Sequence, residues 1–286
     1  MAILLEQLLN AVALSALLFL VSVGLSLVFG ILRVVNFAHG VFYMLGAYVS
    51  FTAVALSGSF WVSLVVVPPV IGLLGALLER STLRFIYRRP PIYQLLLTFG
   101  LALILEEGVR VVYGPTAKPV DPPSILQGFV AAGGFAYPRY RLFLIVLGAV
   151  VGLGLWLALK RTRAGLVIRA VAQNSEMADC LGADVEMVRT LVFGFACALA
   201  GLGGVAAAPM TSAYLGMGIS VIVDAFVVVV VGGLGSLGGS MAGSLIVGAA
   251  QTWGGFYLPE TAMVIMYAVM GAILIFRPWG LFGEEE

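Results

Sequence analysis

Charged residues, histidine and cysteine are all scarce in this chain. Only 10% of its 286 residues are charged, there is one histidine, and the mean hydropathy is +1.11. Soluble domains carry roughly 25% charged residues, so this composition excludes that class. A net charge of +1 makes no case for nucleic acid as a partner. Cys180 lies in a polar run and Cys197 in an apolar one, so we expect buried or inert thiols rather than a disulfide framework.

Long apolar runs take the place of charge. Hydrophobic residues make up 62% of the chain, and runs of about 20 such residues are typical of membrane-spanning helices rather than barrel strands. The sequence therefore predicts an all-α polytopic membrane protein with a single transmembrane domain over residues 1–286. About nine transmembrane helices (8–10) are expected, near residues 8–30, 37–57, 60–79, 92–112, 141–159, 187–209, 219–235, 240–258 and 261–276. The first run is longer than a signal-peptide core, so we expect it to stay as a span.

Basic residues predict the orientation, because Lys and Arg concentrate in cytoplasmic loops. One basic cluster lies within residues 80–89 and another within 160–189, and two predicted spans separate them. Both clusters are expected inside, together with Arg33 and Arg277, which gives an N-out and C-in arrangement. The basic residues that this arrangement leaves outside or at the outer edge are Arg110, Lys118, Arg139 and Arg141.

The longest strongly polar run, RAVAQNSEMADCLGADVEMVR at residues 169–189, interrupts the apolar sequence. Asn174, or the serine after it, is a suitable N-cap, and Glu176 places an acid in the first turn, where the helix dipole favours it. Gly182 is a natural helix stop. We therefore predict a short cytoplasmic helix, about Ser175–Leu181.

Two interpretations of this helix stay open on its residues alone. Met177, Ala178 and Leu181 are expected to give it a small apolar face, while Glu176 and Asp179 stay polar. A helix that binds the lipid surface carries Lys or Arg on its polar face, so the acids favour docking into a protein. A solvated connector is the alternative.

Three stretches of the chain resemble one family of transport proteins. They are GLSLVFGILRVVNFAHGVFYMLGAY at residues 24–48, the frame RA...N...A..LG at residues 169–182 preceded by RTRAG, and DAFVVVVVGGLGSLGGSMAGSLIVG at residues 224–248. With the ending IFRPWGLFG, they resemble the permeases of the branched-chain amino acid class of ABC importers, and RVVNFAHG resembles the H-type (LivH-type) subunit. The likeness covers nearly the whole chain.

The resemblance implies a multi-pass permease of a bacterial or archaeal inner membrane that forms half of a translocation pathway. Its implied partners are a second related permease of the M-type, two cytoplasmic ATPase subunits and an external substrate-binding protein. ATP and Mg are then bound by the ATPases, and no cofactor is bound by this chain. A coupling loop at about residues 160–186 is implied to contact an ATPase. Its residues in this role are Arg169, Ala170, Asn174, Glu176, Ala178, Leu181 and Gly182.

Polar residues inside or beside the spans are candidates for the transport pathway: Asn36, His39, Glu106, Glu107 and Asp224. A lone histidine cannot build a metal site, and none is expected. For His39 we favour capping and packing where the chain turns, with a pathway or gating role as the alternative. Asn36 can cap the following helix, and Gly30 and Gly40 allow a break at membrane depth if it lines a cavity.

Acids within the membrane are functional hypotheses by default. Arg110 follows Glu106 by four residues and Glu107 by three, so we favour an intrahelical ion pair there. The double glutamate is not recognised as part of the family pattern. For Asp224, expected near the outer end of a span, the structural and functional interpretations both remain open.

Small residues at every fourth position predict close contacts between membrane helices. The two stripes are Ala196, Ala200, Gly204 and Ala208, and Ser240, Ser244 and Gly248. We favour packing within the chain over a subunit interface for both. GGLGSLGG at residues 232–239 lacks the Lys-Ser/Thr of a phosphate-binding loop, so it predicts a tight turn between helices rather than ATP binding.

The leading hypothesis is a non-catalytic permease subunit of an ATP-driven importer. Its expected solutes are branched-chain amino acids first, with amides, urea or aromatic acids as alternatives that an external binding protein would select. The second hypothesis is an ion-coupled secondary transporter or channel that uses intramembrane acids. The sequence shows no convincing repeat of two broken helices, which counts against it. No nucleophile, base and orienter stand at a readable spacing, so we expect no enzyme.

Overall fold

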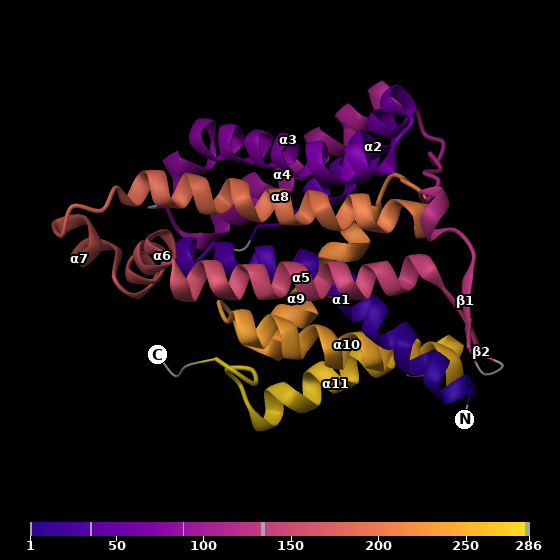
Figure 1. Ribbon diagram of the computed structural model, residues 1–286. Helices are drawn as coiled ribbons and strands as arrows, with labels where there is room; N and C mark the ends of the chain where they lie inside the picture. The colour runs from indigo at the N-terminus through magenta and orange to yellow at the C-terminus, as the bar shows by residue number, and fades with distance from the viewer. Residues whose placement is uncertain (1, 35, 88, 133–134, 284–286) are drawn as a thin grey trace.

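The computed structural model describes residues 2–34, 36–87, 89–132 and 135–283, and most of them are helical (Figure 1). The α-helices are α1 (Ala2–Leu32), α2 (His39–Ser57), α3 (Phe60–Ser81), α4 (Pro91–Tyr113), α5 (Arg139–Arg161), α6 (Arg163–Gln173), α7 (Ser175–Cys180), α8 (Val185–Thr211), α9 (Met217–Gly232), α10 (Leu237–Tyr257) and α11 (Ala262–Phe276). Short 3-10 helices are η1 (Leu83–Ile86), η2 (Ser124–Leu126) and η3 (Pro259–Thr261), and the strands are β1 (Phe129–Ala132) and β2 (Phe135–Pro138).

Within the described residues, five helices are long and apolar enough to cross a membrane: α1, α2, α3, α5 and α8. α9 and α10 meet at a bend of 117° and make a sixth crossing if the pair counts as one broken span. α11 is apolar but shorter. The chain is therefore an all-α polytopic membrane protein, as its composition predicts.

The connection after α1 returns the chain to the middle of the bundle. α1 ends at Leu32, where Arg33 adopts a positive φ of 52°. His39, the first residue of α2, already lies beside Val21 in the middle of α1, with 3.0 Å between its Nε2 and the Val21 carbonyl oxygen. The break that Gly30 and Gly40 predict therefore lies inside the bundle.

The connection after α8 makes a second break of the same kind. Ser212, directly after α8, has a φ of 61°, and it shares a positive φ with only Arg33 among the described residues other than glycine. α9 then begins at Met217, which is 2% exposed. Gly40 and Gly218 pack so closely that a Cβ at Gly40 would overlap the Gly218 carbonyl oxygen. The first turns of α2 and α9 therefore meet.

α1 and α8 run in opposite directions through the bundle (Figure 1). An added Cβ at Gly24 would lie 2.8 Å from the Ala196 carbonyl oxygen, whereas Gly203 packs against Val21. Residue numbers that increase along α1 therefore pair with residue numbers that decrease along α8, so the two helices are antiparallel.

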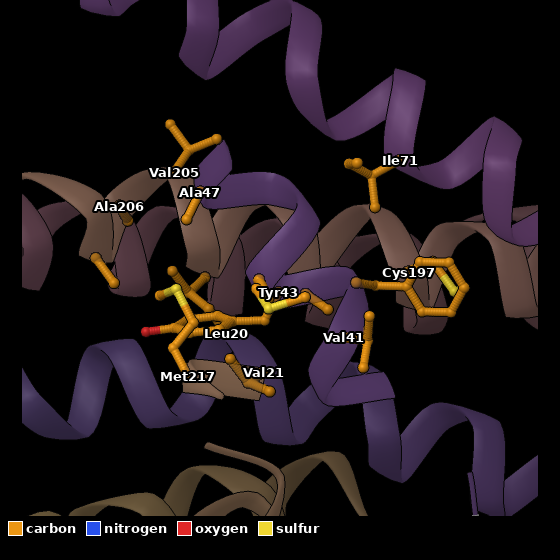
Figure 2. Packing of buried hydrophobic residues seen from close by; sticks show 14 of the residues in the cluster. Leu20, Val21, Val41, Tyr43, Ala47, Ile71, Cys197, Val205, Ala206 and Met217 are labelled. Atoms are coloured by element: carbon orange, nitrogen blue, oxygen red, sulfur yellow. The ribbon is translucent and has the colours of Figure 1, made fainter. Parts of the chain in front are cut away.

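α8 lies at the centre of the main apolar core and packs against α1, α2 and α3. A Cβ at Gly204 would overlap the carbonyl oxygen of Tyr43, and one at Gly46 would overlap the backbone of Gly201. Such close backbone approach gives membrane helices the van der Waals contact that holds them together. Figure 2 shows core residues from five helices, among them Leu20, Val21, Val41, Tyr43, Ala47, Ile71, Cys197, Val205, Ala206 and Met217.

One end of the bundle, the hairpin end, carries the antiparallel strands β1 and β2, with Phe129 opposite Pro138 (Figure 1). The Tyr137 hydroxyl donates to Oδ1 of Asn10 at 3.1 Å, and the Arg141 guanidinium donates to the same oxygen. These bonds tie the hairpin and the start of α5 to α1.

The opposite end, the loop end, carries α6 and α7 (Figure 1). The sequence predicts a helix only at about Ser175–Leu181, and the structure has α7 there, but it adds α6 before it. Thr162 starts α6, because its Oγ1 accepts a hydrogen bond from the Gly165 backbone N–H at 3.0 Å. In the sequence, Thr162 lies within the basic cluster at Lys160 to Arg163, so it is difficult to identify there as a helix cap.

Candidate coupling loop and buried polar sites

Helix α7 is held by caps at both of its ends. Oδ1 of Asn174 accepts a hydrogen bond from the Met177 backbone N–H at 2.9 Å, which confirms the predicted N-cap. Gly182 has a φ of 89°, the left-handed conformation that ends helices. Asp184 then caps α8 by accepting from the Met187 N–H at 2.9 Å. The loop therefore has one defined shape.

The apolar residues of α7, and Leu181 directly after it, differ in how far they are buried. Ala178 is 4% exposed, whereas Met177 is 59% and Leu181 is 82% exposed. Of the predicted apolar face, only the small Ala178 is buried against the bundle, whereas Met177 and Leu181 remain exposed. Ala178 packs in a cluster with Ile31, Val171, Val185 and Val192.

The outer surface of the loop combines exposed apolar and acidic side chains. Glu176 and Asp179 are exposed beside Met177 and Leu181. Cys197 is buried, whereas the Cys180 thiol is exposed, so of the two expected states, buried or inert, burial applies only to Cys197. We call Glu176, Met177, Asp179, Cys180 and Leu181 the loop surface.

The remaining residues of the predicted loop site lie on α6. Arg169 and Ala170 are both exposed, and Val171 beside them is buried. The Ala170 carbonyl oxygen accepts a hydrogen bond from the Asn174 backbone N–H at 3.0 Å, which ends α6. α6 therefore carries the loop surface on a fixed base.

A buried carboxylate at the loop end is absent from the sequence predictions. Glu79 of α3 is 1% exposed. Its Oε1 accepts a hydrogen bond from the Tyr87 hydroxyl at 2.8 Å, and its Oε2 accepts one from Thr190 Oγ1 at 2.6 Å. The Arg189 guanidinium lies 5.8 Å from the centroid of the Tyr87 ring. Glu79 therefore joins α3, the α3–α4 connection and the start of α8.

This cluster adjoins the candidate coupling loop. Burial and the charge of Glu79 both raise the pKa of Tyr87, so its hydroxyl stays protonated as a donor. Arg84 pairs with Glu186 in the first turn of α8, at the surface of the same region. The sequence signal for Glu79 is an acidic residue at the end of an apolar run. Because Glu79 directly precedes Arg80, the sequence alone suggests that it belongs to the polar boundary of the span.

Asn36 and His39 lie together at the first break, and both are fully buried. Because the Val21 carbonyl can only accept, His39 donates from Nε2, and its Nδ1 has no hydrogen-bond partner among the described residues. Oδ1 of Asn36 accepts from the Ala38 N–H at 3.0 Å. This bond forms a turn before α2 instead of the predicted helix cap, since Ala38 occupies the N-cap position.

The intramembrane acids lie apart from one another. Glu107 pairs with Arg110 at 3.0 Å, one turn along α4, and both side chains are more than half exposed. Glu106 is half-buried on the same helix. Asp224 does not lie near the outer end of a span: it lies between Ile222, which packs on Gly40, and Phe226. Asp224 also interacts with Gln251 of α10.

The two small-residue stripes face the interior of the chain. Ala196, Ala200 and Ala208 are at most 1% exposed, and Gly204 lies against α2. Ser240 and Ser244 are buried, and Gly248 packs so closely on Ser15 of α1 that an added Cβ would overlap its hydroxyl. The glycine-rich segment between α9 and α10 is a turn, in which Gly233 and Gly235 have positive φ.

The sequence of the whole chain places it among transport proteins. The family model for the permease component of branched-chain amino acid transport systems matches residues 7–275. The chain is 28% identical to the high-affinity branched-chain amino acid transport system permease protein BraD of Pseudomonas aeruginosa, over 99% of this chain and 96% of the relative.

Two further relatives have the same level of identity. The permease protein LivH of Escherichia coli K12 is 28% identical over 99% of this chain and 96% of its own length. The probable LivH of Methanocaldococcus jannaschii is 28% identical over 96% of this chain and 91% of its own length. No solved structure matches the chain significantly. With its apolar spans and a family match over nearly all of its length, the chain belongs to the permease components of branched-chain amino acid transport systems.

Proposed function

We propose that this chain is the non-catalytic permease subunit of an ATP-driven ABC importer in a bacterial or archaeal inner membrane. It forms half of a pathway for branched-chain amino acids or related small solutes such as amides, urea or aromatic acids. Family membership supports this proposal, as do relatives whose names specify branched-chain amino acid transport.

The proposed topology has nine crossings, with the N-terminus outside and the C-terminus inside. Each of α1 to α5 and α8 to α11 then counts as one crossing, although α9 and α11 are shorter than the helices that are long enough to cross by themselves. The loop end carries Lys160, Arg161 and Arg163, which supports a cytoplasmic location for that end.

The proposed assembly contains a related M-type permease, two cytoplasmic ATPases and an external binding protein. ATP and Mg belong to the ATPases, and this chain supplies the coupling loop. The observation that carries the proposal is the loop surface, where Met177 and Leu181 are exposed while Ala178 fixes α7 to the bundle. Exposed apolar side chains on a rigid base are suited to binding a protein partner.

Two substitutions on the loop surface test the coupling role. In proteoliposomes with all partner subunits, Leu181→Arg and Glu176→Arg are each expected to lower solute uptake about ten-fold or more, the size expected when a residue at the centre of an interface is lost. Ile125→Arg is the matched control for ATPase association, because Ile125 is 67% exposed at the opposite, hairpin end. Unchanged uptake and unchanged ATPase association in both loop variants would show that the loop is only a connector.

The burial of Ala178 adds a further control. Ala178→Arg forces a charge into the cluster around Val171 and Val185, so we expect a lower yield of folded protein rather than uncoupling. Folded yield is measured by size-exclusion chromatography in detergent. A well-folded, uncoupled Ala178→Arg variant would contradict the orientation of α7.

The alternative is an ion-coupled secondary transporter. The bend of 117° between α9 and α10 and the position of Asp224 on α9 favour this candidate, since broken helices hold coupling ions in transporters. Uptake by this chain alone in ATP-free vesicles under an ion gradient, lost in Asp224→Asn, would establish the alternative and exclude the importer.

A further inference from the structure

A groove runs along the outside of the bundle between α5 and α10. α1 packs against both of these helices and forms the floor, where Ala16 lies against Gly148 and Phe19 lies against Gly152. Met241 and Leu245 line the wall on α10. The groove encloses about 410 Å³, within the range of about 300–1,000 Å³ that is typical of sites for small molecules.

The lining of the groove offers almost nothing to a polar ligand. It contains no charged side chain, and its two hydroxyl groups are those of Ser15 and Ser244. Ser15 donates to the Ala11 carbonyl oxygen at 2.7 Å, and Ser244 donates to the Met241 carbonyl oxygen at 2.9 Å. Because both hydroxyl protons are used within their own helices, whatever fills the groove must itself be apolar.

The chemistry changes where the groove reaches the loop end. Trp156 lines the groove there, and Lys160, one turn further along α5, places its ammonium 5.5 Å from the centroid of the Trp156 ring. Lys160 and Arg161 close α5, and the exposed Arg163 begins α6. An indole at the boundary of an apolar surface and a cationic cluster is the arrangement that anchors proteins at the headgroup level of a bilayer.

We propose that this groove is a binding site for one anionic phospholipid. An acyl chain lies between α5 and α10, and the phosphate binds Lys160 and Arg161 beyond the Trp156 ring. Charge complementarity selects this occupant: an apolar groove alone accepts any lipid tail, but the adjoining cations favour an anionic headgroup over a zwitterionic one. The site does not depend on which solute the protein transports.

Native mass spectrometry of the purified full chain tests the site, with phosphatidylglycerol and phosphatidylcholine of identical acyl chains as probes. The expected result is preferential retention of phosphatidylglycerol. Lys160→Gln is expected to lower that retention about five-fold while leaving phosphatidylcholine unchanged, because each basic residue contributes one electrostatic contact. Lys118→Gln is the matched control, since Lys118 also lies over an aromatic ring, 6.0 Å from the Phe51 centroid, at the hairpin end.

A second variant tests the groove apart from its charges. Ala149 lines the groove, and Ala149→Phe is expected to lower the retention of both lipids by filling the space of the acyl chain. Leu103→Phe on α4 is its control, because Leu103 is 49% exposed away from the groove. Circular dichroism establishes that each variant keeps its helices.

Three outcomes overturn the proposal. Equal retention of the two lipids would show that the headgroup is not recognised. Unchanged retention in Ala149→Phe would show that no acyl chain binds in the groove. A photo-crosslinking side chain at Met241 in the assembled transporter is expected to capture lipid. If it captures a second permease chain instead, the groove is a protein interface.

Discussion

Thr190 of α8 donates a hydrogen bond to Glu79 of α3 at 2.6 Å, although 111 residues separate them in the chain. The same carboxylate accepts from Tyr87, in the connection that follows α3. The bond lies just beyond the candidate coupling loop, because α8 begins at Val185. Glu79 therefore links the start of α8 to α3 and to the α3–α4 connection.

Replacement of this buried carboxylate is expected to destabilise the protein. Glu79→Ala leaves the Tyr87 hydroxyl without its acceptor, which costs about 1–3 kcal/mol for a buried group, whereas the Thr190 hydroxyl keeps the Glu186 carbonyl oxygen as an acceptor. Thermal unfolding in detergent, followed by tryptophan fluorescence, measures the loss. Glu107→Ala is the control, since Glu107 is exposed and pairs only with Arg110, and exposed pairs contribute about 0–1 kcal/mol. Equal changes in both variants would contradict a structural role for Glu79.

Glycines at helix contacts are expected to differ sharply from glycines on open faces. A Cβ at Gly204 overlaps the Tyr43 carbonyl oxygen, so Gly204→Ala pushes α2 away from α8 and lowers stability by about 1–3 kcal/mol. Gly154 has no neighbour within 4 Å of an added Cβ. Gly154→Ala is therefore expected to be neutral or stabilising by up to about 1 kcal/mol, since alanine favours helix. The same unfolding measurement is applied to both variants. A Gly154→Ala variant that is less stable than Gly204→Ala would contradict this packing.

The exposure of Cys180 allows the orientation to be measured on the natural chain. Cys180 is exposed on the loop surface and Cys197 is buried in the core. When the chain is expressed without its ATPase partners, a membrane-impermeant maleimide is expected to label it in inside-out vesicles but not in intact cells with a sealed inner membrane. Cys180→Ser should abolish the labelling. Modification from the outer side would reverse the proposed topology.

Asn10 is expected to hold the hairpin against α1. Asn10→Ala removes the acceptor for Tyr137 and Arg141, and the loss of such bonds costs about 1 kcal/mol each. Hydrogen exchange of the backbone amides of β1 and β2 should become faster, while α8 keeps its protection. Ser57→Ala serves as the control, because the Ser57 hydroxyl donates to Ala53 within its own helix. Unchanged exchange in Asn10→Ala would mean that the hairpin is stable without α1.

The predicted spans overlap with helices in the structure. Predictions about polar residues were reliable only where the two groups in contact are close together in the sequence. The caps of Asn174 and Asp184 were predictable, because each bond reaches only three residues along the chain. The burial of Ala178 was not, since it depends on contact with Ile31 of a helix far away in sequence. Sequence spacing grouped Met177, Ala178 and Leu181 as one apolar face, and packing buries only Ala178 of the three.

By itself, the sequence determined that this chain forms membrane helices, where many of them lie and how the polar loop is capped, because transfer to lipid and helix capping act on neighbouring residues. Only the tertiary structure decided that α2 and α9 begin at mid-bundle, that Glu79 meets Thr190 and that α5 and α10 leave a groove. The physical reason is that these relationships depend on how closely α1 and α8 approach their neighbours through glycine and other small residues. That approach is a property of pairs of helices, and no single stretch of sequence contains it.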